Sequence, residues 1–194
     1  MTAKTQDPRT TDIEFRRRTI DAGEARCAVF RRTYDAAIDD VWDACTNSER
    51  LARWYAPVQG DLRPGGEFSQ GSFGGGRVVR CEQPSRLTVA LGGGDTWPDQ
   101  LQLVLEATAE GTTVLEFEHA TTLDTHEIGG QIFDAVYCMG GGYGPRLLTL
   151  DQHLRGELPE LDPSLLHLRE EYRPAINDAM ARLDTLIKAD KRSR

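Results

Sequence analysis

The chain has 194 residues, a formal net charge of −8 and 39% hydrophobic residues, which fits one domain that can bury a core, or a core with a cavity. The acidic balance argues against general nucleic-acid binding, because no basic excess would neutralise phosphates. No stretch approaches the about 20 apolar residues that a membrane span needs, and the N-terminus has no apolar segment typical of a secretory signal.

The pattern divides the chain into three parts. Residues 1–24 are a polar N-terminal arm, in which Ile13, Phe15 and Ile20 indicate an added strand or an ordered segment. Residues 25–157 form the main domain, and residues 158–194 are a C-terminal helical extension. The first clear strand of the main domain runs from Ala25 to Tyr34.

Two short helices follow this strand. Apolar residues recur at helical spacing on one face of the first helix: Ile38, Val41, Trp42 and Cys45. Asn47 or Ser48 can cap the second helix, whose buried side carries Leu51 and Trp54, with Tyr55 as a further candidate. Pro57 and Gly60 then end it. Helices inserted directly after a strand, each with an inward tryptophan, indicate that they close one end of a curved sheet.

A run of short strands with tight turns comes next and predicts an antiparallel meander. The expected strands are 67–69, 77–83, 86–91, 100–107 and 112–120, with turns at Pro84-Ser85, at Gly92 to Asp95 and at Glu110-Gly111. The glycine-rich segment 71–77 lacks a Gly-Lys-Ser/Thr ending and is expected to be a hairpin, not a phosphate loop. Three sets alternate on one buried face: Leu87, Val89 and Leu91; Leu101, Leu103 and Leu105; and Leu115, Phe117 and His119.

The end of the main domain predicts one long helix. Residues 121–142 suggest a loop and a short apolar run that fits helix or strand, before the three glycines 140–142 break the chain. From Tyr143, leucines recur at helical spacing, with Pro145 in the first turn and Gly156 at the C-cap. Beyond it, helices are expected over 164–172 and from Pro174. The last helix is amphipathic and must dock on its own domain or pair with a second copy.

The stretch from Arg31 to Gly66 also resembles the opening of the heat-shock-protein-90 ATPase activator-like family, within the START-like (SRPBCC, helix-grip) superfamily. The matching residues are Arg32, Tyr34, Ala36 or Ala37, Val41, Trp42, Ala44, Thr46, Glu49, Leu51, Trp54, Gly65, Gly66 and Phe68. The resemblance covers about Arg26 to Gly156. It implies an α+β helix-grip fold, in which a curved antiparallel sheet surrounds the long C-terminal helix. That helix usually opens with Gly-Trp in the family, whereas Gly142-Tyr143 stands here and adds a hydroxyl that needs a partner.

A groove between sheet and helix leaves a ligand cavity unless large side chains fill it. The candidates to line it are Phe68, Phe73, Val89, Leu103, Phe117, Tyr143 and Leu147, with Trp97 at the rim and Arg80 or His119 as orienting polar groups. A cavity of about 300 Å³ or more would favour ligand binding, whereas a filled interior would favour a scaffold or co-chaperone role.

No constellation in the sequence assigns catalysis, a cofactor or a metal. The four histidines have no ligand spacing, although His119, His126 and Glu127 meeting at a pocket rim is an alternative to a strand-end histidine and a solvent loop. The four cysteines are widely spaced and are expected to be reduced thiols of a cytoplasmic protein. Glu116 and Glu118 share one strand face, which is expected to be solvated.

The leading hypothesis, which rests on the resemblance, is a non-enzymatic START-like protein that binds a small, largely apolar ligand in the groove. One alternative is an interaction protein that modulates a chaperone ATPase. The other is a cyclase- or hydrolase-type enzyme that uses His119, Arg80 and Tyr143. The expected partners are the apolar ligand and, in the second case, a chaperone, with no nucleic acid and no membrane. The sequence leaves monomer and homodimer open.

Overall fold

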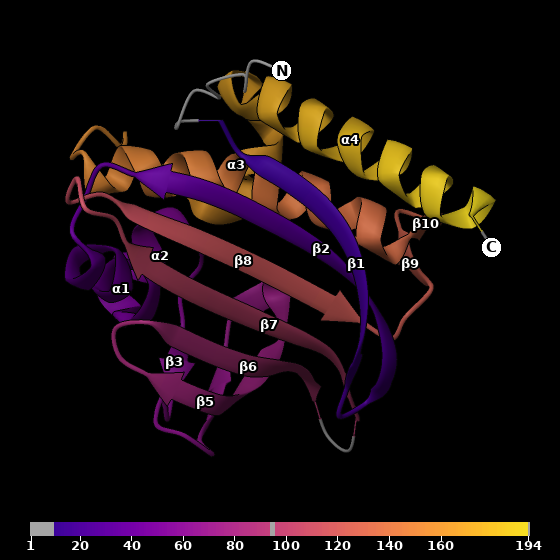
Figure 1. Ribbon diagram of the computed structural model, residues 1–194, viewed down its shortest axis with the longest axis horizontal. Coiled ribbons are helices and arrows are strands. Elements are labelled where there is room, and N and C mark those ends of the chain that lie inside the picture. Colours follow the sequence, from indigo (N-terminus) through magenta and orange to yellow (C-terminus); the bar gives the residue numbers. More distant parts are fainter. Residues whose placement is uncertain (1–9, 94–95, 194) are drawn as a thin grey trace.

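The computed structural model describes residues 10–93 and 96–193. An antiparallel sheet of eight strands, in the order β1-β2-β8-β7-β6-β5-β4-β3, curves around the long helix α3 (Figure 1). Its strands are β1 (Asp12–Ile20), β2 (Gly23–Tyr34), β3 (Gln59–Gly60), β4 (Glu67–Ser69), β5 (Gly75–Glu82), β6 (Arg86–Gly93), β7 (Thr96–Ala107) and β8 (Thr113–Thr121). The expected α+β helix-grip fold is therefore confirmed. Residues 1–9 of the expected N-terminal arm, and residues 94 and 95 of the expected glycine turn, lie outside the described residues.

The added N-terminal strand is present as β1, which pairs with β2 along its whole length. Its basic residues are not simply solvated. Arg16 forms an ion pair with Glu116 at 3.0 Å, and Arg18 forms one with Glu118 at 2.6 Å. The expectation of a solvated Glu116 and Glu118 face is thus wrong for Glu118, which is buried and is paired with Arg18, whose side chain reaches it from β1 across β2.

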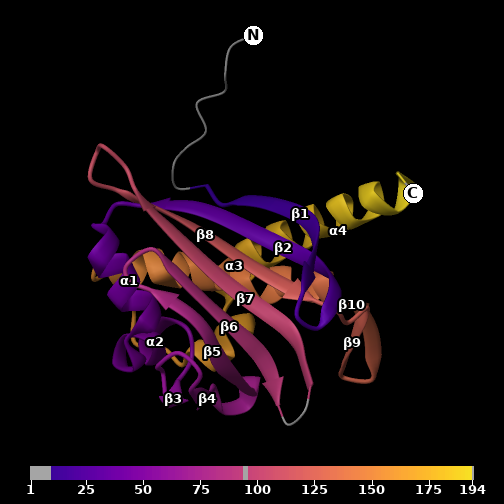
Figure 2. The same ribbon diagram turned by 60° about the horizontal axis from the view of Figure 1, so that its bottom comes forward.

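The helix pair α1 (Ile38–Thr46) and α2 (Ser48–Trp54) covers one end of the sheet, as expected (Figure 2). The Asn47 side chain caps α2 by accepting hydrogen bonds from the backbone N–H groups of Glu49 and Arg50 at 3.0 and 3.3 Å. The indole N–H of Trp54 donates to the carbonyl of Ala44 at 2.9 Å, which ties the two helices together. Both tryptophans of the pair are buried and act as structural anchors.

The concave face of the sheet carries the residues that alternation predicted. Val89 is opposite Leu101, and Leu103 is opposite Phe117 in the neighbouring strand. The segment expected to be a glycine hairpin differs slightly, because η1 (Gly71–Phe73) forms one turn of 3₁₀ helix before β5 begins. The alternation thus places a continuous apolar surface in front of α3.

The long helix begins earlier than the sequence predicted. A hairpin of β9 (Thr125–Ile128) and β10 (Gln131–Asp134) leads into α3 (Ala135–Leu154), and Asp134 caps it by accepting from the N–H of Val136 at 3.0 Å. The three glycines lie inside α3 and Pro145 lies in its interior, so the expected break at 140–142 is wrong. The helix ends where expected, with Gly156 in the left-handed region at a φ of 69°.

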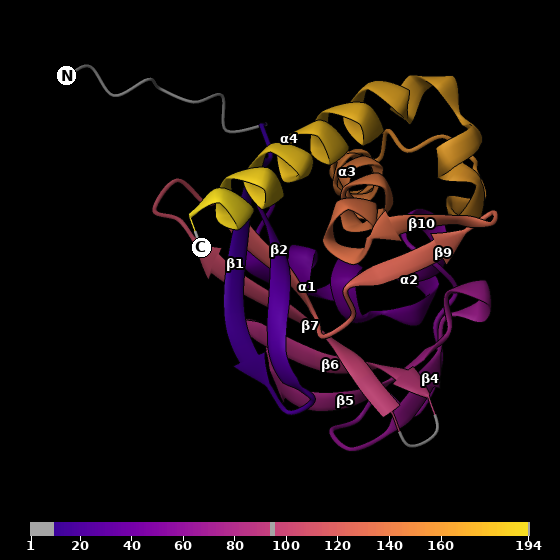
Figure 3. The ribbon, with the colours of Figure 1, turned by 90° about the vertical axis from the view of Figure 1, so that its right-hand side faces the viewer.

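The C-terminal segment docks on its own chain. The expected helix over 164–172 is two short 3₁₀ segments, η2 (Pro163–Leu168) and η3 (Glu170–Tyr172), followed by α4 (Arg173–Arg192). Helix α4 lies against α3 and the edge strand β1 (Figure 3). It buries Ala179, Leu183 and Ile187, and Arg17 of β1 holds Asp190 at 2.7 Å. No helix of the described residues combines the length and apolarity needed to cross a bilayer.

Candidate functional site

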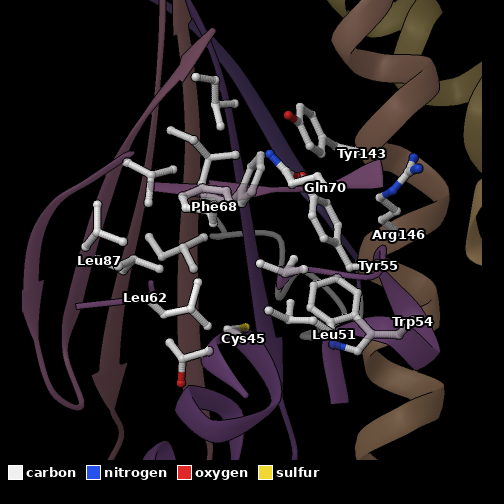
Figure 4. Close-up of a pocket in the computed structure, with 18 of the residues that line it drawn as sticks. Cys45, Leu51, Trp54, Tyr55, Leu62, Phe68, Gln70, Leu87, Tyr143 and Arg146 are labelled. Carbon is white, nitrogen blue, oxygen red and sulfur yellow. The ribbon is translucent and has the colours of Figure 1, made fainter. Parts of the chain in front are cut away.

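A small apolar cavity, here called the inner cavity, lies between the concave face of the sheet and the helices (Figure 4). Its volume is about 120 Å³. The strands form one wall, α3 forms the opposite wall, and α1 and α2 form the floor (Figure 4). The main lining residues are Cys45, Leu51, Trp54, Val58, Leu62, Phe68, Val78, Cys81, Leu87, Val89, Leu101, Leu103, Leu115, Phe117 and Leu147. An apolar space of this size fits a small apolar group.

A second, more polar space, here called the outer chamber, adjoins the inner cavity. Its volume is about 450 Å³, and its walls include Phe73, Asp99, His119, His126 and Cys138. The two spaces share a set of boundary residues, which are Tyr55, Gln70, Leu91, Tyr143 and Arg146. The inner cavity alone is smaller than the about 300 Å³ typical of ligand pockets, whereas the outer chamber exceeds it.

Eight of the ten residues predicted to line the groove lie on these two spaces. Phe68, Val89, Leu103, Phe117, Tyr143 and Leu147 line the inner cavity, and Phe73 and His119 line the outer chamber.

Arg80 and Trp97 lie elsewhere. The pairing of β5 with β6 shifts between Val78 and Arg80, and such a bulge reverses which side chains face inward. Arg80 therefore points to solvent, where it forms an ion pair with Glu82, and Cys81 takes the inward position. A second shift between Leu91 and Gly93 accompanies the outward position of Trp97, which packs under the Arg77 guanidinium at 5.1 Å on the convex face.

Sequence reasoning missed four polar residues that face the site: Tyr55, Gln70, Asp99 and Arg146. The position of two of them could have been predicted from the sequence. Asp99 is two residues from Leu101 in the same strand and so shares its inward face, and Arg146 follows Tyr143 by about one helical turn and so lies on the same side of the helix. Gln70 sits between β4 and η1 and had none, because loop geometry decides where its side chain points.

The hydroxyl of Tyr143 finds its partner in His119. Its oxygen lies 2.8 Å from Nδ1 of the imidazole, while Nε2 on the other side lies 3.5 Å from Oδ2 of Asp99. In the tautomer whose Nε2–H faces the carboxylate, Nδ1 is an acceptor and the Tyr143 hydroxyl donates to it. Asp99, His119 and Tyr143 thus form one polar chain along a wall of the outer chamber.

The charges in this chain follow from burial and contact. Burial alone would raise the pKa of the Asp99 carboxyl, but His119, Thr121 and His126 outweigh it and hold that pKa below its usual value. Burial raises the pKa of the Tyr143 phenol well above its usual value, and Tyr55 and Asp99 add to this. Asp99 is therefore the charged member, and Tyr143 is a neutral hydrogen-bond donor.

Two buried atoms of the chain are incompletely satisfied. Oδ1 of Asp99 and Nε2 of His119 form no hydrogen bond of good geometry with the described residues, and Nε2 only approaches Oδ2 of Asp99 at 3.5 Å. A buried polar atom without a partner costs about 1–3 kcal/mol, so a polar group bound in the outer chamber would relieve this cost. No cluster of His, Cys, Asp and Glu in the described ranges could hold a metal ion.

Comparison with known proteins agrees with this architecture. The model of the family described as activator of Hsp90 ATPase homolog 1-like protein matches residues 35–143. The chain belongs to this family. No curated protein matches it.

The crystal structure of CalU16 from Micromonospora echinospora is similar over nearly the whole chain. It has 31% sequence identity and a TM-score of 0.76, covering 92% of this chain and 99% of that one. Its solution structure gives a TM-score of 0.75 at the same 31% identity, covering 94% of this chain and 98% of that one. Coverage of this extent takes in segments on both sides of residues 35–143.

A structure described as PFC0360w, an HSP90 activator from Plasmodium falciparum, has 16% identity and a TM-score of 0.55. It covers 70% of this chain and 99% of that one. This likeness shows the shared fold.

Proposed function

We propose that this member of the family binds a small, largely apolar ligand in the groove between the sheet and α3. The observation that carries the proposal is the inner cavity of about 120 Å³, which is lined almost entirely by apolar side chains and adjoins the outer chamber. A dry cavity of about 150 Å³ lined by Leu, Ile and Phe accepts benzene. One aromatic ring or a short branched chain fits the inner cavity, and the rest of the ligand occupies the outer chamber.

Apolar and polar residues of the groove have different roles in binding the ligand. Phe68, Leu103 and Phe117 supply apolar contact, and the Asp99–His119–Tyr143 chain orients a polar group of the ligand. Residues 25–157 form the START-like domain that carries the site. Residues 158–194 stabilise this domain, because α4 packs against α3.

The test is a fluorescence titration with N-phenylnaphthylamine, a neutral probe that brightens in apolar surroundings, together with native mass spectrometry of the purified protein. The variant Leu103→Trp fills the inner cavity, and Leu165→Trp, at a side chain that is 46% exposed on η2, is the matched control. The probe affinity should fall about tenfold or more in Leu103→Trp only, because excluding a buried ring removes about 1.5–3 kcal/mol. A wild-type protein that neither carries a ligand nor binds the probe would count against the proposal.

Family membership favours a second partner, a chaperone of the heat-shock-protein-90 class. This role predicts direct binding to the purified chaperone and stimulation of its ATPase, and the absence of both would rule the role out.

The enzymatic alternative draws on the polar chain of Asp99, His119 and Tyr143. It predicts turnover of a bound ligand, which mass spectrometry after incubation would detect.

We also propose a cytoplasmic location. All four cysteines are free thiols, and disulfides are rare in reducing compartments. Fractionation of the native cells would test this.

A further inference from the structure

The side chain of Arg146 lies at the boundary between the inner cavity and the outer chamber. It projects from α3 beside Tyr143 and Tyr55 (Figure 4). Its guanidinium carbon is 5.5 Å from the centre of the Tyr55 ring and 4.9 Å from that of Phe73. Tyr55 is the C-cap of α2 and Phe73 belongs to η1, so rings from two segments hold the guanidinium at this boundary, here called the entrance to the inner cavity.

The positive charge of Arg146 has no carboxylate partner in the part of the chain that the structure describes. Within the described residues, its side chain donates a hydrogen bond from Nη1 to the backbone carbonyl of Gly142, at 2.5 Å. Arg50, which is also half-buried, contrasts with it, because Asp40 and Asp43 lie 2.7 and 3.0 Å from its Nη1. The acidic group of the outer chamber, Asp99, faces His119 instead.

A guanidinium in this setting is a good receptor for an acid. Its planar fork of five donors matches a carboxylate or sulfonate in two parallel hydrogen bonds. The single bond to Gly142 leaves most of these donors free. Stacking between rings limits the motion of the side chain, so little conformational entropy is lost when an anion binds.

We propose that Arg146 is an anion-recognising residue, and that the ligand class is an amphipathic organic acid. The apolar body of the acid occupies the inner cavity, and its acidic group pairs with Arg146 at the entrance. This inference rests on the proposed ligand-binding function and names the chemical class of the ligand. The net charge of −8 repels anions from the protein as a whole. A preference for an acidic ligand would therefore have to come from the positive charge of Arg146 at the site.

The experiment compares two probes that share one aromatic body. Anilinonaphthalene sulfonate carries an acidic group, and N-phenylnaphthylamine lacks it. Both are titrated against the wild type, Arg146→Gln, Arg146→Lys and Arg53→Gln. Arg53 lies on α2 and is exposed, so Arg53→Gln changes the net charge equally outside the site.

We expect Arg146→Gln to weaken the sulfonate probe about 10- to 100-fold, the range that a charge-assisted hydrogen-bonded pair spans, and to leave the neutral probe unchanged. Arg146→Lys keeps the charge without the fork and should give an intermediate loss. Arg53→Gln should leave both probes unchanged.

Three outcomes would overturn the inference. An equal loss of the sulfonate probe in Arg53→Gln would assign the effect to general charge. An equal loss of both probes in Arg146→Gln would assign it to packing on Tyr55 and Phe73, while the proposed function would stand. Failure of the wild type to bind either probe would remove the proposed function itself.

Discussion

The glycines inside α3 allow a sharp test of how the C-terminal helix supports the site. A Cβ built on Gly144 would lie 2.8 Å from the carbonyl oxygen of Ala175 and 2.9 Å from Cβ of Ala179, both on α4. A Cβ on Gly142 of the same helix would meet nothing within 4 Å. Gly144→Ala and Gly142→Ala therefore make the same chemical change on the packed and the open side of one helix.

The expected magnitudes follow from two opposing effects. Replacing glycine by alanine inside a helix favours folding by about 1 kcal/mol, and this gain is common to both variants. Gly144→Ala also forces a methyl group against the backbone of α4, and overpacking of this kind typically costs about 1–3 kcal/mol. Gly142→Ala should thus be up to about 1 kcal/mol more stable than the wild type, and the two variants should differ by about 1–3 kcal/mol.

The assay is equilibrium unfolding in guanidinium chloride, followed by far-ultraviolet circular dichroism, with the free energy of unfolding compared at equal m-values. Gly140→Ala serves as a second packed-side variant, because a Cβ there would lie 2.9 Å from the backbone nitrogen of Met180. Equal stability of Gly144→Ala and Gly142→Ala would refute the reasoning, since it would mean that α4 does not lie against this face of α3.

Two further predictions concern single side chains. Asp99→Asn should lower the free energy of unfolding by about 1–3 kcal/mol near neutral pH, because it removes a buried charged partner of His119. The folded-state pKa of Asp99 is depressed, so its stabilising effect is present above the unfolded pKa of about 3.9 and is lost as the pH falls further. The difference between wild type and variant, measured by urea unfolding across this range, should shrink on acidification; a gap that widens would contradict the assignment. Burial raises the pKa of the Cys45 thiol to about 12 and that of Cys27 to about 11, so at pH 8 a thiol reagent should label exposed Cys81 first and should reach Cys27 and Cys45 only in denaturant. Peptide mapping of the labelled protein checks the order, and early labelling of Cys45 would show that its surroundings open readily.

The sequence was most informative where local signals act alone. The helix pair was predictable because apolar spacing, the Asn47 cap and Pro57 all lie within a few residues of the structure they specify. The concave face of the sheet was predictable for the same reason, since side chains alternate along every strand regardless of its neighbours. These two patterns, with the family resemblance, were enough for the fold and for six residues of the inner cavity.

The site was harder to predict where a bulge or a loop sets the direction of a side chain. Strict alternation from Val78 would turn Arg80 inward, but the register shift between them places Cys81 there. A bulge depends on pairing with the next strand, and no local pattern in β5 announces it. The stacking of Arg146 on Phe73 likewise joins two segments far apart in the chain.

The sequence by itself determined the main strands of the meander, the helix pair and most of the apolar lining, because each depends on residues that are neighbours in the chain. Only the tertiary structure decided that the three glycines 140–142 continue α3. Glycine favours a break in isolation, but Gly140 and Gly144 let the backbone of α4 approach closely, and the packing gained outweighs their weak helix propensity. Tyr143 and Arg146 lie on the same helix as these close contacts, and α4, which makes them, lies outside the matched family segment.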